Sequence, residues 1–404
     1  MSGAVSLRRQ ASDTGHAPGP DPVHPRVLTM PTLPDLLKAT VDLGASDLHI
    51  TTSSAPQVRV DGQLRPLALP SLGPAETEQL AYSVLSDAQK RRFEETSELD
   101  FSFGVRGIAR FRCNVFSQRG AVAAVYKLIP EVIRSVRELG LPPVIEQMAD
   151  RPRGLVLVTG PTGCGKSTTL AALIDKINTE RHFHILTIED PIEYLHPHKN
   201  CLVNQRELHS DTKGFAPALR AALREDPDVV VIGELRDLET IESALRIAET
   251  GHLTFATVHT NSAYQTINRI IGVFPDSQQA QVRAQLSLVL EGIMCQTLLP
   301  KLGRSGRVVA TEVMIPTPAI RSLIREDKIH QLYSAMQAGQ EKIGMQTMNQ
   351  SLATLVRLRR ISMETALAAS SMQDELRDIV QHGAGVVAGA GMPRRVSRSP
   401  IRGR

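Results

Sequence analysis

Gly160-Pro161-Thr162-Gly163-Cys164-Gly165-Lys166-Ser167-Thr168 fits the pattern G-x-x-x-x-G-K-[ST] of a phosphate-binding loop. An apolar run of strand length precedes it at residues 155–159, and residues 169–174 have a helical pattern. In a strand–loop–helix context, glycines let successive backbone N–H groups face a chain of phosphates. The pattern predicts that Lys166 reaches the β- and γ-phosphates and that Ser167 holds Mg²⁺. The alternative, a glycine-rich turn that binds nothing, is disfavoured by these flanks.

Composition and charge argue against several classes of protein. The chain has 404 residues, enough for two or three domains, and its formal charge is +4. Aromatic residues are only 3% and tryptophan is absent, so we expect no stacking platform for single-stranded nucleic acid. No apolar run reaches about 18 residues and no apolar signal core opens the chain, which predicts a cytoplasmic protein. The widely spaced cysteines form no C-x-x-C pair and predict reduced thiols: Cys113, Cys164, Cys201 and Cys295.

Both ends of the chain have the composition of disordered tails. Residues 1–29 are rich in Gly, Pro, Ser, Arg and His, and an amphipathic segment begins soon after Met30. Met30 is therefore a candidate true start, and a genuine flexible tail is the alternative. Residues 381–404 are rich in Gly and Arg and contain no acid, which predicts a disordered basic tail of open function.

Residues 30–130 are expected to form an α+β domain with a small antiparallel sheet. A helix is predicted over 33–44, and a helical stretch is predicted from about 74 to 95. Asp61-Gly62 between two extended runs predicts a hairpin. Alternating apolar and polar positions predict the later strands. The predicted strands are 47–50, 57–60, 63–67, 100–103, 109–116 and 121–128.

Residues 131–153 carry several prolines and are predicted to be a linker. From Gly154 to residue 380, strands alternate with helices, which indicates an α/β domain with a parallel sheet. Residues 318–371 are expected to be mostly helical. The predicted strands are 155–159, 184–188, 229–232, 253–258 and 308–314.

An acidic residue follows the β-branched run 229–232. Such a run predicts a strand buried on both faces, and ligands bind where strands of parallel sheets end. Glu234 is therefore predicted to polarise the attacking water and to bind Mg²⁺ through water. A helix-capping or surface glutamate is the alternative. Gly233 is expected to make room for a close approach of neighbouring atoms.

Two further groups are expected at the same edge of the sheet. Glu189, Asp190 and Glu193 follow the strand over 184–188, and one of them is predicted to bind Mg²⁺ through water or to position the nucleophile. A solvated turn is the alternative. His259 follows the strand over 253–258 and is a candidate sensor of the γ-phosphate. A zinc site is the rival interpretation for the histidines, but their H-x-H spacing without cysteines argues against it.

Three arginines lie in the later strands of the first domain: Arg110, Arg112 and Arg119. Arginines on a separate domain can stabilise charge on a transferring phosphoryl group. Strand alternation places Arg110 and Arg112 on one face, opposite Phe111. A basic solvated face is the equally simple alternative.

Four motifs together resemble the secretion ATPase superfamily of type II secretion and type IV pili. They are GPTGCGKST, TIEDPIEY, DPDVVVIGELRD and GHLTFATVHTNSA, which are similar to its Walker A, Asp-box, Walker B and His-box motifs in that order. Residues 44–49 resemble the entry to its N-terminal PAS-like domain. The resemblance covers about residues 31–380 and leaves only the two tails outside.

Other residues are similar to the pilus-retraction (PilT-type) branch of that superfamily. Residues 319–326 match its motif AIRNLIRE except for Ser322, and residues 344–352 are similar as well. A four-cysteine zinc insertion, usual in the extension and secretion branches, does not occur in this sequence. Cys164 stands where serine is common in this loop, and its thiol suggests sensitivity to oxidation.

The resemblance implies a PAS-like α+β domain followed by a RecA-like P-loop ATPase domain with C-terminal helices. It implies a cytoplasmic homohexamer, peripheral at the inner membrane, with Mg-ATP between subunits and with arginines of the PAS-like domain on the phosphates. The implied function is ATP-driven pilus retraction and twitching motility. The implied partners are a PilC-like platform protein of the inner membrane and a PilU- or PilT-type paralogue.

Several other functions remain open at this level. Within the superfamily they are a PilU-like accessory retraction ATPase, a pilus assembly or type II secretion ATPase, and a DNA-uptake motor. From other classes they are a P-loop kinase for a small acceptor and a nucleic-acid translocase. The resemblance favours retraction, whereas the physical pattern alone gives no direction to the motor.

Overall fold

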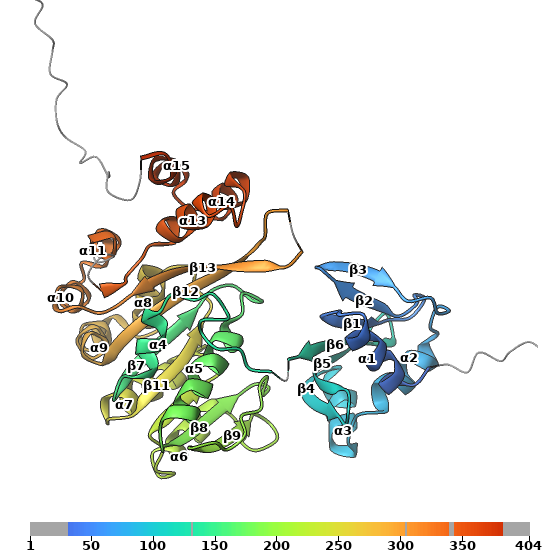
Figure 1. Cartoon of the computed structure of the whole chain (residues 1–404). Coiled ribbons are helices and arrows are strands. Elements are labelled where there is room, and N and C mark those ends of the chain that lie inside the picture. Colours follow the sequence, from blue (N-terminus) through green and yellow to red (C-terminus); the bar gives the residue numbers. More distant parts are fainter. Residues whose placement is uncertain (1–30, 131, 304, 339–342, 383–404) are drawn as a thin grey trace, which may run out of the picture.

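The computed structural model describes residues 31–130, 132–303, 305–338 and 343–382. Both predicted tails lie outside these residues, except for 381–382, and so does Met30. The described residues form an α/β structure with two separate sheets (Figure 1). We call residues 31–130 the N-terminal body and residues 132–382, with the gaps given above, the C-terminal body.

The N-terminal body contains an antiparallel sheet in the order β3-β2-β1-β6-β5-β4. The predicted hairpin at Asp61-Gly62 is confirmed, with both residues at positive φ. Helix α1 buries Leu36 and Leu37 against the sheet, whose inner face carries Phe111. The elements are α1 (Leu33–Asp42), β1 (Asp47–Ile50), β2 (Gln57–Val60), β3 (Gln63–Pro66), α2 (Pro74–Tyr82), α3 (Asp87–Thr96), β4 (Glu98–Val105), β5 (Ala109–Gln118) and β6 (Ala121–Ile129).

The helical stretch predicted from about residue 74 to 95 is confirmed, and the structure divides it into two helices. Helix α2 ends at Tyr82, and α3 starts after Ser86. The Ser86 hydroxyl accepts a hydrogen bond from Gln89 N at 3.3 Å, and Gln89 Oε1 accepts one from Ser86 N at 2.9 Å. This reciprocal capping box satisfies N–H groups at a helix start and favours a new helix over continuation of α2.

The C-terminal body contains a sheet in the order β13-β12-β7-β11-β10-β8-β9. Neighbouring strands are parallel except for β12 and β13. The five predicted strands are present, whereas β9 and β12 had not been predicted. The strands are β7 (Gly154–Thr159), β8 (His184–Glu189), β9 (Leu202–Glu207), β10 (Val229–Ile232), β11 (Leu253–Val258), β12 (Leu290–Pro300) and β13 (Arg307–Met314).

Helices cover this sheet, and a further helical group lies beside β12 and β13 (Figure 1). Leu352, Ile361 and Leu376 form a separate apolar cluster with Leu299 and Ala310 of those strands. The helices are α4 (Val144–Ala149), α5 (Lys166–Glu180), α6 (Phe215–Ala222), α7 (Leu238–Glu249), α8 (Ala263–Gly272), α9 (Asp276–Val289), α10 (Pro318–Arg325), the 3₁₀ turn η1 (Ile329–Gln331), α11 (Leu332–Ala338), α13 (Met348–Arg357), α14 (Met363–Ala369) and α15 (Gln373–His382).

Much of the segment expected to be a linker packs into the C-terminal body. Val136, Ile145 and Met148 are buried in the same core as strand β7, and Met148 contacts the position of Gly292 in β12. The linker was predicted to span residues 131–153. The part of it that is not packed into the C-terminal body is therefore shorter than predicted.

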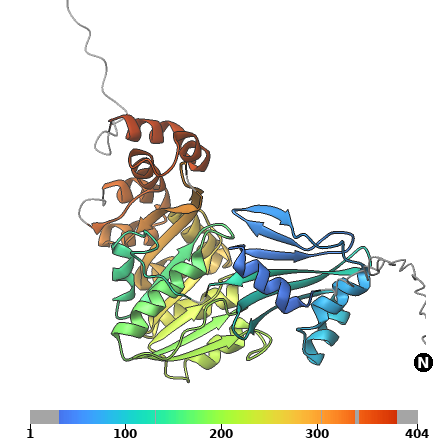
Figure 2. The same cartoon turned by 45° about the vertical axis from the view of Figure 1, so that its right-hand side comes forward.

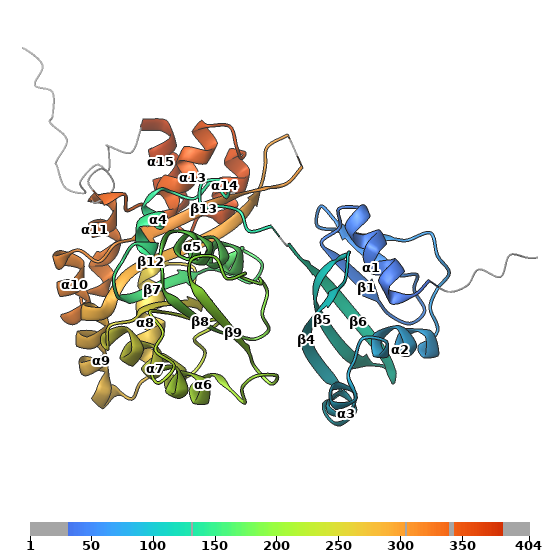
Figure 3. The same cartoon turned by 60° about the horizontal axis from the view of Figure 1, so that its bottom comes forward.

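The two bodies lie side by side, with β4 and β5 turned toward the loops around β8 and β9 (Figures 2 and 3). Ion pairs of Arg110 with Glu207 and of Arg112 with Glu193 join them. Among the helices that the structure describes, none is both long and apolar enough to cross a membrane.

Candidate functional site

Four strands bring the predicted motifs to one edge of the sheet. Val258 of β11 pairs with Thr159 of β7, and Ile232 of β10 pairs with Ile188 of β8, all in parallel. Because these strands end together, the phosphate loop, the acidic group after β8, Glu234 and His259 share one rim. This rim is the usual ligand position in open parallel sheets.

The phosphate loop has a backbone that requires glycine. Gly160, Gly163 and Gly165 have φ angles of 139°, 78° and 91°. A Cβ on Gly160 would lie 2.3 Å from the carbonyl oxygen of Gln296, so this position also needs the missing side chain. Lys166 then starts α5, whose first N–H groups have no partner within the helix. This arrangement of backbone N–H groups beside Lys166 suits an anion.

Lys166 folds back over the loop. Its Nζ donates to the carbonyl oxygens of Gly160 at 2.9 Å and Pro161 at 3.2 Å. Burial lowers the pKa of Lys166, against the opposing fields of Cys164, Glu234 and Glu193. The amine is thus held within the loop, in the field of Glu234.

Gln296 in the middle of β12 braces the loop from below. Its side-chain amide donates to the carbonyl oxygen of Cys164 at 2.7 Å, and its oxygen accepts from the hydroxyl of Thr169 at 2.8 Å. The residue is 3% exposed. Sequence reasoning missed it because β12 was not predicted; a glutamine inside the apolar run 293–299 was the available signal.

Glu234 lies two residues beyond β10, opposite the phosphate loop. Its carboxylate is 2.7 Å from the Arg236 guanidinium and 3.3 Å from His259 Nε2. Burial raises the pKa of Glu234, but the hydrogen bond to Arg236 and the charges of Arg236, His259 and Lys166 lower it further, so the net pKa is lowered. The group is therefore an ionised carboxylate at neutral pH.

His259 joins Glu234 to the loop. While Nε2 faces Glu234, Nδ1 lies 3.4 Å from the hydroxyl of Thr162. Gly233 admits the close approach expected of it, because a Cβ there would lie 3.3 Å from the Glu189 Cα. The His259 side chain thus contacts both the phosphate loop and the Glu234 carboxylate that follows β10.

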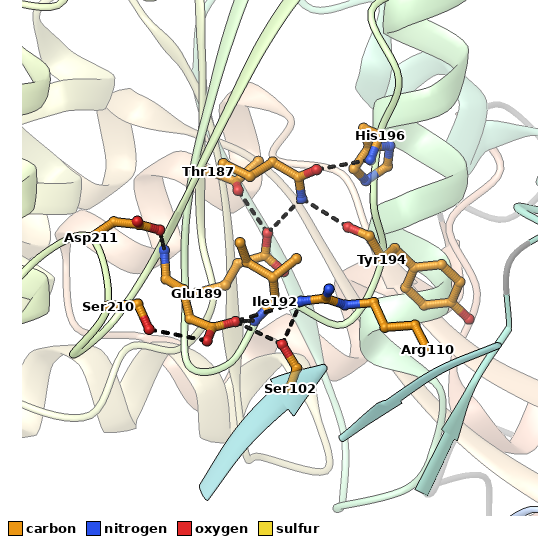
Figure 4. Close-up of polar contacts among 11 residues, drawn as sticks. Ser102, Arg110, Thr187, Glu189, Ile192, Tyr194, His196, Ser210 and Asp211 are labelled. Carbon is orange, nitrogen blue, oxygen red and sulfur yellow. Dashed lines mark hydrogen bonds and ion pairs between the residues drawn. The ribbon is translucent and has the colours of Figure 1, made fainter. Parts of the chain in front are cut away.

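The acidic residues at the end of β8 and just after it occupy different environments. Glu189 Oε1 accepts from the hydroxyl of Thr187 at 2.6 Å and from the amide of Gln205 at 3.2 Å (Figure 4). Burial raises the pKa of Glu189 to about 7, although these hydrogen bonds oppose the shift. Glu193 instead faces Arg112 at 3.3 Å. The structure therefore places Glu189 in a structural network and Glu193 at the contact between the bodies.

The raised pKa of Glu189 makes fold stability depend on pH. The contribution of protonated Glu189 to the free energy of unfolding is fully present below its pKa in the unfolded chain, near 4.5. This contribution is lost as pH rises through the pKa of about 7 in the folded protein. At about 1.4 kcal/mol per pKa unit, the upper bound is about 3 kcal/mol. We expect Glu189→Gln to raise the thermal midpoint relative to wild type at pH 8 but not at pH 4.5. Equal differences at both pH values would contradict this assignment.

The three arginines do not act as one group. Arg110 and Arg112 lie on the face of β5 opposite Phe111, as alternation predicted. Arg112 contacts Asp100 at 3.1 Å and Glu193 at 3.3 Å, and its guanidinium pKa is raised because the fields of Asp100, Glu193 and Asp190 outweigh burial. Arg119 lies in the turn after the far end of β5 and is exposed. With a rise of about 3.3 Å per residue, Arg119 is roughly 30 Å along the strand from Arg110.

Glu207 and Tyr194 are further residues that sequence reasoning missed. Glu207 ends β9 and contacts Ser102 and Arg110 of the N-terminal body. The Tyr194 hydroxyl lies 2.9 Å from that of Thr168 in the phosphate loop. Tyr194 stood within the quoted motif TIEDPIEY, whereas Glu207 gave no local signal because its partners lie about a hundred residues earlier.

The structure argues against oxidation of Cys164. The residue is buried, and burial raises the pKa of its thiol although Lys166 opposes the shift. A buried neutral thiol reacts slowly with oxidants, so the expected redox sensitivity is not supported.

No cluster of three or more His, Cys, Asp or Glu with metal-binding geometry occurs within the described ranges. His196 is half-buried, and burial lowers its pKa to about 4.

Arg321, in the motif at residues 319–326, contacts the C-terminal end of helix α9 and the residues that follow it. It donates to the carbonyl oxygens of Ser287 and Leu288 at the end of α9 and pairs with Glu291 at 2.8 Å. An arginine on the last carbonyls of a helix stabilises that end. The apolar residues Ile320 and Ile324 of the same helix are buried.

These residues fit Mg-ATP on structural grounds. The loop offers backbone donors and Lys166, Ser167 follows at the helix start, and the ionised Glu234 faces them across the rim. Hydroxyl and carboxylate oxygens are the ligands that Mg²⁺ prefers. The donor set therefore suits a triphosphate with its metal.

Comparison with known proteins agrees with this geometry. The family model described as Type II/IV secretion system protein matches residues 26–383. The type IV pilus retraction ATPase PilT of Pseudomonas aeruginosa is 53% identical over 82% of this chain and 96% of its own length. The type IV pilus ATPase PilU of the same organism is 42% identical over 86% and 91%.

A solved structure extends the likeness to three dimensions. The crystal structure of the pilus retraction motor PilT with bound ADP has a TM-score of 0.79 and 53% identity, covering 86% of this chain and 99% of that one. Such identity over nearly the whole of a relative fixes the family and the enzyme class. The chain belongs to the type II/IV secretion system protein family, and within it to the PilT-type ATPases.

Proposed function

We propose that this chain is a Mg-ATP-driven motor that retracts type IV pili. The observation that carries the proposal is the meeting of Lys166, Glu234 and His259 on one rim, in a chain so similar to a retraction ATPase. On this proposal the N-terminal body is a PAS-like domain and the C-terminal body is a RecA-like ATPase domain.

Each residue at the rim has a role in this proposal. The loop from Gly160 to Thr168 binds the phosphates, and Ser167 holds Mg²⁺, which neutralises charge on them. Glu234 accepts a hydrogen bond from the attacking water and orients it. His259 links the loop to Glu234 and reports the γ-phosphate, and Glu193 is the better placed of the Asp-box carboxylates to bind metal through water.

The proposed motor is a homohexamer at the cytoplasmic face of the inner membrane. Its platform partner is a PilC-like membrane protein, and a PilU- or PilT-type paralogue is a second partner. Closure of the N-terminal body on the nucleotide brings Arg110 and Arg112 to the phosphates, whereas the position of Arg119 suits a contact elsewhere. Repeated around a ring, such closure and opening delivers mechanical work.

Deletion of the gene tests the direction of the motor. We expect excess surface pili and no twitching, with both defects reversed by the wild-type gene supplied in trans. Cells without pili would contradict retraction and indicate an assembly ATPase. Cells that still twitch would indicate a PilU-like accessory role, which the lower identity to PilU disfavours.

A further inference from the structure

Glu207 joins the two bodies through one carboxylate oxygen. Oε2 accepts hydrogen bonds from the hydroxyl of Ser102 at 2.9 Å and from the backbone N–H of Ile192 at 3.0 Å. The same oxygen lies 3.8 Å from the Arg110 guanidinium, which also donates to Ser102. Figure 4 shows Ser102 and Arg110 near Ile192, and Glu207 also contacts Ser210 and Asp211. The Glu207 side chain is only 12% exposed, so this contact is largely shielded from solvent.

Arg110 is incompletely satisfied in this contact. A guanidinium has five N–H donors. Within the described part of the chain, Arg110 Nε is buried without a hydrogen-bond partner, and the pairing with Glu207 is longer than a hydrogen bond. Neighbouring Arg112 is better held, by Asp100 and Glu193. A bidentate anion would serve Arg110 better than Glu207 does, because paired N–H···O bonds to phosphate are short and charge-assisted.

We propose that Glu207 is a latch that holds Arg110 on the C-terminal body of its own chain and must release it for Arg110 to bind the nucleotide phosphates. This inference rests on the proposed function, in which Arg110 stabilises the phosphates. The latch competes with ATP, because only the unlatched fraction offers its arginine to the nucleotide. A smaller competent fraction lowers apparent affinity in proportion.

The latch predicts a KM effect without a kcat effect. Glu207→Gln keeps acceptors for Ile192 N–H and for Ser102 but removes the charge that attracts Arg110. We expect the KM for ATP to fall by about threefold to tenfold, in keeping with a partly buried ion pair, with kcat within about twofold of wild type. Arg110→Gln should move KM in the opposite direction, because it removes the ligand as well as the latch.

Two other variants keep this test interpretable. Glu225→Gln is the matched control: Glu225 pairs with Arg206 at 2.7 Å inside the C-terminal body and has no ion pair to the N-terminal body, so KM should not change. Ser102→Ala removes the hydroxyl between Glu207 and Arg110 and should lower KM less than Glu207→Gln. A Glu207→Gln variant that is folded by circular dichroism and has an unchanged or raised KM would overturn the latch.

A distance measurement separates the latch from the pilus function. Dyes on Glu95→Cys in α3 and Arg224→Cys after α6 report the separation of the two bodies; the four native cysteines are buried. Doubly labelled chains are diluted into unlabelled protein. Without nucleotide, we expect Glu207→Gln to shift the distribution of energy transfer relative to wild type, and Glu225→Gln to leave it unchanged. No shift with Glu207→Gln would overturn the latch even if gene deletion confirmed retraction.

Discussion

Glu234→Gln should abolish ATP turnover while nucleotide binding is retained. The Glu234 carboxylate is ionised and lies beside His259 at the rim that the phosphate loop occupies. Glutamine keeps the size of the side chain but cannot accept a proton or polarise water as a carboxylate does. The loss of a positioned base usually costs about 10²- to 10⁴-fold in rate. We therefore expect turnover to fall in that range.

Steady-state ATPase assays and titration with a fluorescent ATP analogue measure the two properties separately. Glu242→Gln on the exposed face of α7 is a suitable control, because Glu242 pairs with Arg246 one helical turn away and, among the residues that the structure describes, with no other cation. Hydrolysis near the wild-type rate by Glu234→Gln would refute the assigned role. Loss of nucleotide binding would instead show that Glu234 mainly shapes the loop.

Gln296→Leu should weaken nucleotide binding although Gln296 is not part of the phosphate loop. Leucine fills a similar volume but leaves the Cys164 carbonyl and the Thr169 hydroxyl without partners. Each unpaired buried polar group costs about 1–3 kcal/mol. If half of the combined cost for the two groups, about 1–3 kcal/mol, is spent on distorting the loop, affinity falls by about fivefold to a hundredfold, at about 1.4 kcal/mol per factor of ten.

Thr169→Val provides a graded comparison for Gln296→Leu. It removes only one of the two hydrogen bonds and should therefore have the smaller effect on affinity. Isothermal titration with ADP and a thermal melt of each variant separate binding from overall stability. Wild-type affinity in a folded Gln296→Leu protein would show that the loop keeps its shape without this brace.

The local features of the site could be predicted because each of them depends on residues that are neighbours in the sequence. Strand, glycine-rich loop and helix around Lys166 follow from a contiguous pattern, and so does the position of Glu234 after a buried strand. The face of β5 that carries Arg110 and Arg112 follows from alternation alone. Each of these predictions depends on backbone periodicity, which a few residues are enough to define.

The break between α2 and α3 lies at the limit of such reasoning. Ser86 and Gln89 carry a capping signal, but a helical pattern on both sides of it does not fix where one helix ends and the next begins. Strand β12 was missed for a similar reason, because a short apolar run has no periodicity that separates strand from helix.

By itself the sequence determined which strands and helices present most of the candidate site residues, since these elements depend on contiguous patterns. Only the tertiary structure decided that Gln296 braces a loop 130 or so residues away, that Glu207 holds Arg110, and that Arg119 lies apart from the other arginines. It also decided the raised pKa of Glu189 and the lowered pKa of Glu234. The physical reason is that hydrogen bonds, burial and electric fields act between atoms that are close in space, and chain folding brings distant residues together.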